Sequence, residues 1–473
     1  MFSDAIRREL AAIVGAEWFL DRPEDLLAYS YDATPLHQAL PDGVVFPAST
    51  AEVQAILRLA SRAGLKVIPR GSGTNLAAGT VPVEGGLVLV LTRMNQVLAI
   101  DEENLTATVQ PGAITAPFQA QVEALGLFYP PDPGSIQVST LGGNVAMCAG
   151  GLRGLKYGVT KDYVLGLEAV LPSGEVIRTG GKVMKDVAGY DLTKLLIGSE
   201  GTLAVITEIL LKLVPKPEAK RTALALFPDL TRAARAVSGI IAARIVPATL
   251  EFLDQGTARV VEEYAHAGLP TDVAAVLLIE QDGAPDAVNR DIERIAVICQ
   301  NTGASEVRVA ATPEEAARLM TARRTALAAL ARVRPTTILE DASVPRAKLA
   351  EMVEAIGAIS RKYDLQICTF GHAGDGNLHP TCLTDARDSA EIARVEEAFA
   401  EIFAVAVDLG GTITGEHGVG AAKAGYLEWR IGEHGIALMK RIKAAFDPQG
   451  ILNPGKIFAH TTRKRVVVRR SGG

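Results

Sequence analysis

The chain has 473 residues, of which 48% are hydrophobic and 22% are charged, and its formal net charge is −6. This length exceeds what one hydrophobic core usually organises, so we expect at least two domains. The negative net charge argues against a general nucleic-acid-binding protein, which needs a basic surface.

The sequence predicts neither membrane insertion nor disulfide bonds. No apolar run is long enough to span a bilayer, so we expect a cytoplasmic protein that reaches a membrane only through a partner. The dense basic cluster at residues 463–470 predicts a solvated or partner-docking tail, with contact to an anionic surface as the alternative. The four cysteines are too widely spaced for a disulfide framework or a thiolate cluster, and each is expected to be a buried thiol: Cys148, Cys299, Cys368 and Cys382.

The N-terminal half predicts a region of mixed helices and strands. Residues 1–15 have the pattern of an amphipathic helix. Residues 49–64 predict a second helix, because Ser49 and Glu52 form a capping box and Gly64 ends the apolar periodicity. Short apolar runs then predict strands, including one hairpin that turns at residues 172–174, over residues 65–69, 85–91, 105–112, 165–180 and 201–217.

The pattern changes after Pro215 and Pro217, which mark an expected domain boundary. Residues 218–310 alternate as β-α-β-β-α-β, which is the ferredoxin-like order, and further elements extend this α+β unit. We therefore expect three parts of the chain: a domain over residues 1–217, a second domain over 218–440 and a C-terminal segment over 441–473.

Three glycine-rich segments lie in the N-terminal half. The first, RGSGTNLAAGT at residues 70–80, fits neither a dinucleotide fingerprint, because Leu76 stands where a third glycine is needed, nor a Walker A loop. Alone, its glycines could serve tight turns. Further glycine-rich segments occupy residues 130–151 and 188–208. Because backbone amides without side chains can approach a pyrophosphate closely, three such loops suit a long, folded cofactor better than a single phosphate.

Two histidine-bearing motifs lie in the C-terminal half of a chain with seven histidines. In GHAGDGNLHP, His372 ends one predicted strand and His379 begins the next, so a hairpin-like turn brings both imidazoles to one end of a sheet. In GTITGEHGVG, Glu416 precedes His417. Two imidazoles and a carboxylate leave open positions on zinc, iron or manganese. Adjacent residues of an extended chain point to opposite faces, so Glu416 binds the metal while His417 faces the substrate, or the reverse. Ordinary structural histidines are the alternative interpretation.

The glycine-rich segments resemble those of a known family. Pro69–Gly79, Pro131–Gly151 and Asp191–Glu208 look like the three FAD-contacting stretches of the vanillyl-alcohol oxidase superfamily, and ILNPGKIF is similar to its closing motif. The resemblance implies an α+β fold: a two-lobed PCMH-type FAD-binding domain, to which the C-terminal segment returns, and a ferredoxin-like substrate domain. Thr74 and Asn75 stand where some relatives have a histidine that binds FAD covalently, so non-covalent FAD is implied. The residues implied to hold FAD, with Ile206 near the isoalloxazine or adenine end and Asn453 near the flavin, are Pro69, Arg70, Gly71, Ser72, Gly73, Thr74, Asn75, Pro133, Gly134, Ser135, Thr140, Gly142, Gly143, Asn144, Ala149, Gly150, Gly154, Tyr157, Gly158, Glu200, Gly201, Ile206 and Asn453.

The histidine motifs resemble the paired signatures of the flavin-dependent 2-hydroxy-acid dehydrogenases. This group contains glycolate oxidase flavoprotein subunits, D-lactate dehydrogenases and D-2-hydroxyglutarate dehydrogenases. The resemblance implies that His372, His379 and Glu416 bind a divalent metal and that His417 is the catalytic base.

The same resemblance implies an arginine that binds the substrate carboxylate. Arg323 matches the family's WxxR pattern, with Arg324 as the alternative, although Met320 replaces the tryptophan. Pro380 and Thr381 follow the second histidine of the hairpin, as in the glycolate oxidase type, so a small monocarboxylate is favoured over a diacid.

Together these features predict FAD-dependent oxidation of a small 2-hydroxy acid, glycolate or D-lactate, to the 2-oxo acid by hydride transfer to flavin N5. The sequence has no cysteine cluster for iron–sulfur ligands and no recognisable NAD site, so we expect the electrons to pass to an iron–sulfur partner subunit, an electron-transfer flavoprotein or a quinone. The alternatives are a metallohydrolase and a non-catalytic FAD-binding subunit of a larger complex.

Overall fold

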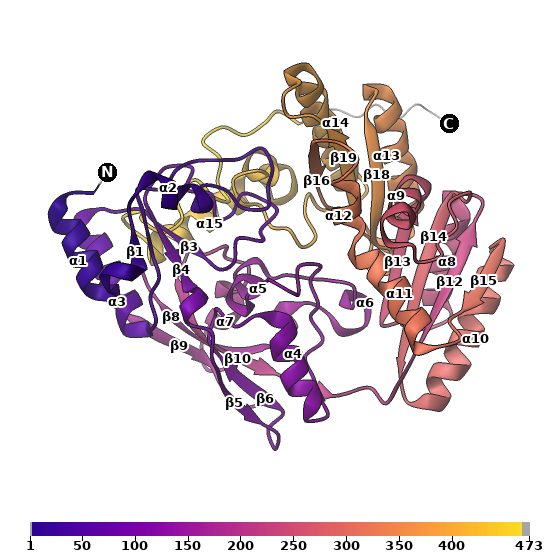
Figure 1. The fold of residues 1–473 in the computed structure, drawn as a ribbon, viewed down its shortest axis with the longest axis horizontal. Helices are drawn as coiled ribbons and strands as arrows, with labels where there is room; N and C mark the ends of the chain where they lie inside the picture. The colour runs from indigo at the N-terminus through magenta and orange to yellow at the C-terminus, as the bar shows by residue number, and fades with distance from the viewer. Residues whose placement is uncertain (1, 466–473) are drawn as a thin grey trace. The chain divides into compact units, whose positions relative to one another are not determined.

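The computed structural model describes residues 2–465, which form two compact units (Figure 1). The first contains the chain up to Gly150, Val159–Lys216 and Glu416–Arg463, and the second contains Gly151–Gly158 and Pro217–Gly415. The domain limits predicted at residues 217 and 440 stay predictions. Residues 466–470 of the predicted basic tail lie outside the described residues.

The first unit contains two main sheets. One has the strand order β1-β2-β4-β3, in which β2, β4 and β3 are parallel. The other has the order β5-β6-β10-β8-β9 and is antiparallel. A short pair joins β7 and β11. The strands are β1 (Phe19–Leu20), β2 (Gly43–Val45), β3 (Val67–Arg70), β4 (Leu87–Val90), β5 (Val97–Asp101), β6 (Thr106–Val109), β7 (Leu127–Phe128), β8 (Val164–Val170), β9 (Val176–Gly180), β10 (Val205–Lys212) and β11 (Val214–Pro215).

Helix α3 (Thr50–Ala63) shows how the sequence sets these elements. The Ser49 hydroxyl accepts a hydrogen bond from Glu52 N at 3.2 Å, and the Glu52 carboxylate accepts one from Ala48 N at 2.8 Å. Gly64 ends the helix with φ +65°, so the predicted start at Ser49 and stop at Gly64 are confirmed, while the Glu52 carboxylate reaches the N–H of Ala48 instead of that of Ser49. The other helices of this unit are α1 (Asp4–Val14), α2 (Pro23–Leu26), α4 (Thr115–Ala124), α5 (Leu141–Met147), α7 (Leu192–Leu196) and α15 (Leu427–Phe446).

The chain after α15 returns to the edge of the first sheet. Val67 of β3 donates from its N–H to Ile451 O at 2.8 Å, and Asn453 N donates to Val67 O at 2.8 Å. Leu452 between them is buried in the core that α1 and α3 form with this sheet. The ILNPGKIF segment therefore belongs to the first unit.

The second unit is built on one sheet of eight strands in the order β15-β12-β14-β13-β18-β19-β16, with β17 paired to β19. The strands β12 to β15 come first in the chain and have the predicted ferredoxin-like order. Helix α9, which lies in the chain between β13 and β14, was not predicted. The strands are β12 (Ala219–Phe227), β13 (Thr249–Asp254), β14 (Ala275–Gly283), β15 (Glu306–Val309), β16 (Thr336–Leu339), β17 (Ala342–Ser343), β18 (Gln366–His372) and β19 (Asn377–Thr384).

Helices cover both faces of this sheet. Four helices pack together on one face, and Figure 1 shows α13 and α14 beside β18 and β19: α8 (Leu230–Ala242), α10 (Pro285–Asn301), α13 (Leu349–Tyr363) and α14 (Ser389–Asp408). A second group packs together on the other face: α9 (Gln255–Ala265), α11 (Pro313–Arg324) and α12 (Ala326–Leu330). A short helix, α6 (Gly154–Tyr157), lies beside β13.

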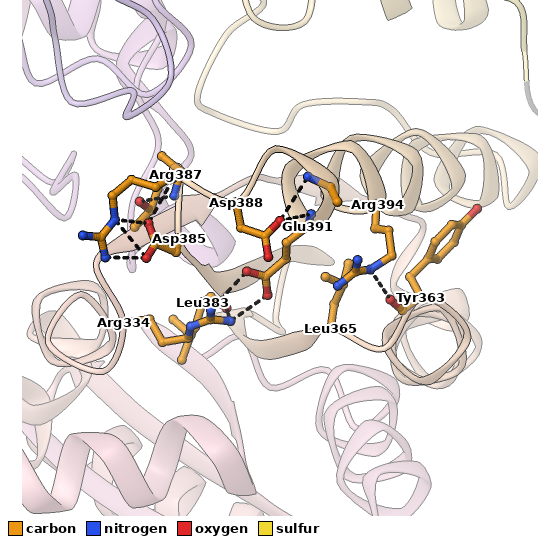
Figure 2. Close-up of polar contacts among 12 residues, drawn as sticks. Arg334, Tyr363, Leu365, Leu383, Asp385, Arg387, Asp388, Glu391 and Arg394 are labelled. Carbon is orange, nitrogen blue, oxygen red and sulfur yellow. Dashed lines mark hydrogen bonds and ion pairs between the residues drawn. The ribbon is translucent and has the colours of Figure 1, made fainter.

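Charged side chains fix the start of α14 to the end of β19, as Figure 2 shows. Asp388 caps the helix by accepting from the N–H groups of Ala390 at 3.1 Å and Glu391 at 3.0 Å. Both carboxylate oxygens of Glu391 meet the Arg334 guanidinium, at 2.6 and 3.0 Å, and Arg334 also donates to Leu383 O at 3.3 Å. This bidentate pair holds the edge of the sheet that carries the hairpin.

Within residues 2–465, no helix combines the length and the apolar character needed to cross a membrane. All four cysteines are free thiols. Cys299, Cys368 and Cys382 are buried, and burial raises the pKa of each thiol to about 12. Cys148 is only partly buried, which corrects the prediction for that residue.

Candidate functional site

The GHAGDGNLHP motif forms a β-hairpin. Strand β18 ends at His372, β19 begins at Asn377, and Gly376 completes the turn with φ +82°. In the register, His372 pairs with Asn377 and Phe370 pairs with His379. Because paired residues share a face and side chains alternate along a strand, both histidines lie on the same face. Their ring centroids are 5.1 Å apart, so the hairpin brings the two imidazoles together.

The neighbouring strand adds a buried carboxylate that the sequence reasoning missed. Glu251 of β13 pairs in register with His372, and its side chain is fully buried. Its Oε1 lies 2.7 Å from His372 Nδ1, and its Oε2 lies 2.6 Å from an Nη of Arg323. Burial opposes ionisation of Glu251, but Arg323 and His372 outweigh it and hold the pKa of this carboxyl below its ordinary value. The available signal was an acidic residue in the interior of an apolar strand, since a fully buried glutamate needs a partner.

Arg323, which was predicted to bind the substrate carboxylate, ends α11 and is only 5% exposed. Its guanidinium lies over the ring of Phe370, 4.8 Å from the centroid. Its Nε is buried and has no hydrogen-bond partner among the described residues. A buried donor without a partner costs free energy, so Nε is suited to receive an anionic ligand. Arg324, the alternative, is partly exposed.

Glu416 is the residue at which the chain leaves the second unit. The preceding Gly415 donates from its N–H to the buried carboxylate of Asp341 at 2.6 Å. A Cβ at Gly415 would stand 2.6 Å from the Asn377 side chain, so this segment runs against the start of β19. Glu416 is bonded to Gly415 and is the first residue of the stretch Glu416–Arg463 in the first unit. The predicted donor set consists of this carboxylate and the pair of hairpin imidazoles in the second unit.

This donor set fits a divalent metal. Two imidazoles and one carboxylate are the ligands of many catalytic sites, and three protein ligands leave coordination positions open. His372 has its Nδ1 against Glu251, so Nε2 is the ring nitrogen that would bind a metal. Metal-binding histidines commonly hold a carboxylate on the other ring nitrogen in this way.

The side chains of Glu416 and His417 were expected to point to opposite faces of an extended chain, and they do not. Residues 415–417 form a bend, and His417 Nε2 lies 3.9 Å from Glu416 Oε1. The expectation of opposite faces was wrong because alternation applies only to extended chain. The His417 carbonyl accepts from Asn75 Nδ2 at 3.4 Å, which ties this residue to the first glycine-rich loop.

Side chains of the first glycine-rich segment fold it on itself. The buried Arg70 guanidinium donates to Tyr31 O at 2.7 Å and to the Thr80 hydroxyl at 3.2 Å, and burial lowers its pKa. The Asn75 side chain accepts from Gly79 N at 2.6 Å. Arg70 and Asn75 therefore shape the loop, and its predicted contact with FAD would be made by the backbone between them.

The second segment packs against the first. Thr140 caps α5 by accepting from Gly143 N at 3.2 Å. A Cβ at Gly71 would collide with the Thr140 hydroxyl, so the two loops approach this closely only because Gly71 has no side chain. The Asn144 amide donates to the Thr115 hydroxyl at 2.8 Å. The side chains of Thr140 and Asn144 are thus engaged within the unit.

The third segment is joined to the C-terminal segment. The Glu200 carboxylate accepts from Val419 N at 2.7 Å and Gly420 N at 2.6 Å, while burial raises its pKa. The Asn453 amide donates to Glu200 O at 2.7 Å and to Gly79 O at 3.0 Å. Its Oδ1 is buried with no hydrogen-bond partner among the described residues. Asn453 therefore links the first and third segments and keeps an acceptor for a bound group, which fits the predicted FAD site.

Three of the residues predicted to contact FAD belong to the second unit. Gly154, Tyr157 and Gly158 lie in its short segment at 151–158. The Tyr157 hydroxyl donates to the Asp282 carboxylate at 2.7 Å, and Lys156 donates to Asp282 O at 2.6 Å. The segment is thus fixed to β14, and its predicted contact with FAD stays a prediction.

The other residues predicted to contact FAD lie in the first unit. Gly150 lies so close to Glu416 that an added Cβ would stand 2.6 Å from its Oε2, which explains a glycine at this position. The remaining residues are Pro69 in β3; Ser72, Gly73 and Thr74 in the first loop; Pro133, Gly134 and Ser135 in a turn; Gly142 in α5; Ala149 after α5; Gly201 before β10; and Ile206 in β10.

Comparison with known proteins identifies the family of this chain. Residues 41–180 match the FAD binding domain family, and residues 216–457 match the family of FAD linked oxidases, C-terminal domain. These matches include the first two glycine-rich segments and both histidine motifs in full, and the third glycine-rich segment lies between the two matched ranges.

Proteins of similar sequence carry two kinds of name. The glycolate oxidase subunit GlcD of Bacillus subtilis is 60% identical over 470 residues, covering 99% of this chain and 100% of that protein. The subunit of the same name from Escherichia coli K12 is 39% identical, covering 92% of this chain and 87% of that protein. A D-lactate dehydrogenase of Anaerostipes hadrus is 36% identical, covering 91% of this chain and 92% of that protein.

Solved structures support the fold. A p-cresol methylhydroxylase has a TM-score of 0.81 at 18% identity, covering 96% of each chain. An alkyldihydroxyacetonephosphate synthase has a TM-score of 0.76 at 21% identity, covering 96% of this chain and 86% of that one. The predicted PCMH-type α+β fold is confirmed. By fold and sequence the protein is an FAD-dependent oxidoreductase. The chain belongs to the FAD-linked oxidases, with similarity to glycolate oxidase subunits and D-lactate dehydrogenases.

Proposed function

We propose that the protein oxidises a small 2-hydroxy acid, with glycolate and D-lactate favoured, to the 2-oxo acid. The observation that carries this proposal is the close pair of hairpin imidazoles, His372 and His379, in a chain 60% identical to a glycolate oxidase subunit. The similarity to a D-lactate dehydrogenase supports the same substrate class.

The substrate carboxylate is proposed to bind Arg323. The buried Nε has no hydrogen-bond partner among the described residues, and a guanidinium forms strong charge-assisted bonds to a carboxylate. Glu251 and the ring of Phe370 fix the guanidinium from other sides, so its orientation is set before a ligand arrives. Thr381 donates to His379 O at 3.2 Å and is thus engaged locally, which agrees with a small acid without a second carboxylate.

A divalent metal, zinc, iron or manganese, is proposed to be held by His372, His379 and Glu416. Its chemistry, when bound, is that of a Lewis acid, which makes a hydroxyl group a stronger acid. The contact of Glu251 with His372 Nδ1 orients that imidazole for the ligand bond.

His417 is proposed as the base that takes the proton of the substrate hydroxyl, because an imidazole titrates near neutral pH. FAD, when bound, supplies two-electron acceptance at N5. We propose that the three glycine-rich segments and Asn453 hold FAD non-covalently, since Thr74 and Asn75 provide no histidine for a covalent bond.

We infer that the electrons leave the protein to a partner with iron–sulfur clusters, to an electron-transfer flavoprotein or to a quinone. Two of the relatives are named subunits, which implies that those proteins assemble with other chains. The four cysteines of this chain are free thiols spread along the sequence. A cytoplasmic location, with any membrane contact through such a partner, completes the proposal.

The experiment is an anaerobic absorbance titration of the purified protein with glycolate, D-lactate and L-lactate in turn. Bleaching of the flavin band by glycolate or D-lactate is the expected result. A colourless protein that FAD does not reconstitute would instead favour a metallohydrolase. A flavin band that all three acids leave oxidised would contradict the proposed substrates and favour a non-catalytic FAD-binding subunit.

A further inference from the structure

Glu251 touches both the proposed metal ligand His372 and the proposed substrate ligand Arg323. Each of its carboxylate oxygens meets one of these side chains, at 2.7 Å from His372 Nδ1 and 2.6 Å from an Nη of Arg323. The three residues come from β13, β18 and α11, so the contact joins separate elements of the second unit.

Glu251 has no exposed surface. It sits in the middle of the sheet, where β13 pairs with β14 on one side and with β18 on the other. A hydrophobic side chain could fill this position without the cost of removing a charge from water. The carboxylate at this position is therefore explained by its contacts with His372 and Arg323 and by the ligands that these two side chains are proposed to bind.

The two contacts act on different ligands. The bond to His372 Nδ1 fixes the plane of the imidazole and thereby the direction of its Nε2, the nitrogen proposed to bind the metal. The ion pair to Arg323 fixes one edge of the guanidinium, while its Nε remains without a partner among the described residues. Movement of the Glu251 carboxylate would therefore disturb both groups at once.

We propose that Glu251 is a positioning residue that couples the metal site to the site of the substrate carboxylate. This inference rests on the proposed function, because it assumes the metal at His372 and the acid at Arg323. Glu251 touches neither ligand itself and acts through the two side chains that do.

The test is the affinity of the full-length, FAD-loaded protein for Mn²⁺ after removal of metal, measured by equilibrium dialysis for the wild type and for Glu251→Gln. The variant keeps the size of the side chain but removes its charge. The expected result is a Kd for Mn²⁺ raised about 10-fold to 100-fold, the usual effect of losing such an outer partner. At saturating Mn²⁺, kcat should recover while the KM for the hydroxy acid stays raised, a split that a general loss of structure would not produce.

Asp254→Asn is the matched control. Asp254 is a partly buried acid at the end of the same strand, where it accepts from Thr257 N at 2.8 Å and Thr369 N at 2.6 Å. Its replacement removes a carboxylate of this strand without touching His372 or Arg323. This variant should lose thermal stability and keep the wild-type Kd for Mn²⁺.

A second variant covers the case in which Glu251→Gln fails to fold because Arg323 is left as an unpaired buried charge. The double variant Glu251→Gln with Arg323→Gln removes both charges, and it should still bind Mn²⁺ about 10-fold to 100-fold more weakly. Arg323→Gln alone keeps the carboxylate at His372 and should bind Mn²⁺ at least as tightly as the wild type.

The outcomes separate the two proposals. Wild-type protein that binds Mn²⁺, together with folded Glu251 variants whose Kd lies within a factor of about two of it, would overturn the role of Glu251 and leave the proposed function standing. Wild-type protein that binds neither Mn²⁺ nor Zn²⁺ would overturn the metal in the proposed function and this inference with it.

Discussion

His417 is the single residue on which the proposed proton transfer depends most directly. Its side chain is mostly buried beside Glu416, with 3.9 Å between ring nitrogen and carboxylate oxygen. His417→Ala should keep bound FAD and slow flavin reduction by the hydroxy acid by roughly 10²-fold to 10⁴-fold, the usual share of a general base. Anaerobic stopped-flow absorbance measures this rate.

The control for that experiment is His434→Ala, which removes an exposed histidine of α15. This variant should reduce its flavin at the wild-type rate. Equal rates for His417→Ala and the wild type would remove His417 from the proton transfer.

The buried thiols give a second prediction at this scale. A pKa of about 12 at Cys299, Cys368 and Cys382 leaves roughly one thiol in ten thousand ionised at pH 8. These residues should resist iodoacetamide in the native protein and react after unfolding, and peptide mass spectrometry follows each cysteine separately. Cys148, which is partly exposed, should react first. Rapid native labelling of all three buried thiols would contradict the packing of the second unit.

Single residues also show where prediction from the sequence stopped. His372, His379 and Glu416 could be singled out because they stand in short glycine-bounded motifs. Glu251 could not, because its partners His372 and Arg323 are far away in the sequence. Pairing of β13 with β18 is a tertiary contact, and no local pattern encodes it.

Among the elements, the hairpin of β18 and β19 sets the distance between His372 and His379, the two histidines proposed to bind a metal. Gly376 has φ +82°, and a Cβ there would collide with Val344 O, which lies at the adjoining strand β17. Gly376→Ala should destabilise the protein by about 1–3 kcal/mol and weaken Mn²⁺ binding, because the turn must shift. Urea unfolding and equilibrium dialysis measure the two effects.

Gly181→Ala is the matched control for the turn. Gly181 does not have the positive φ of Gly376, and an added Cβ there meets no atom within 4 Å. Its replacement should leave both the unfolding free energy and the Mn²⁺ affinity near their wild-type values. If the Gly376 variant behaved in the same way, the turn would not control the histidine pair.

Elements with local signals were predicted well. Ser49, Glu52 and Gly64 fixed both ends of α3, and the turn of the GHAGDGNLHP hairpin followed from its glycines. The helix α9 was missed because Asp254, which caps it, is also the last residue of β13, so no loop separates strand from helix. The bend at 415–417 was missed because glycine on both sides permits it without requiring it.

At the scale of the whole molecule, the predicted fold and FAD class are confirmed by the family matches and the solved structures. The sequence could show that three glycine-rich segments exist, but it could not show how they meet. In the first unit Gly71 allows the first and second segments to approach, and Asn453 joins the first to the third. These contacts depend on absent side chains and on one amide near the C-terminus, which composition and periodicity do not reveal.

The measurement that tests the central claim most directly is the anaerobic rate of flavin reduction by glycolate and by D-lactate before and after removal of metal with a chelator. We predict that the metal-free protein keeps its flavin absorbance, reduces it at least about 100-fold more slowly with the preferred acid, and recovers when Mn²⁺ is added back. An unchanged rate in protein shown to be metal-free by elemental analysis would contradict metal-assisted oxidation of a 2-hydroxy acid.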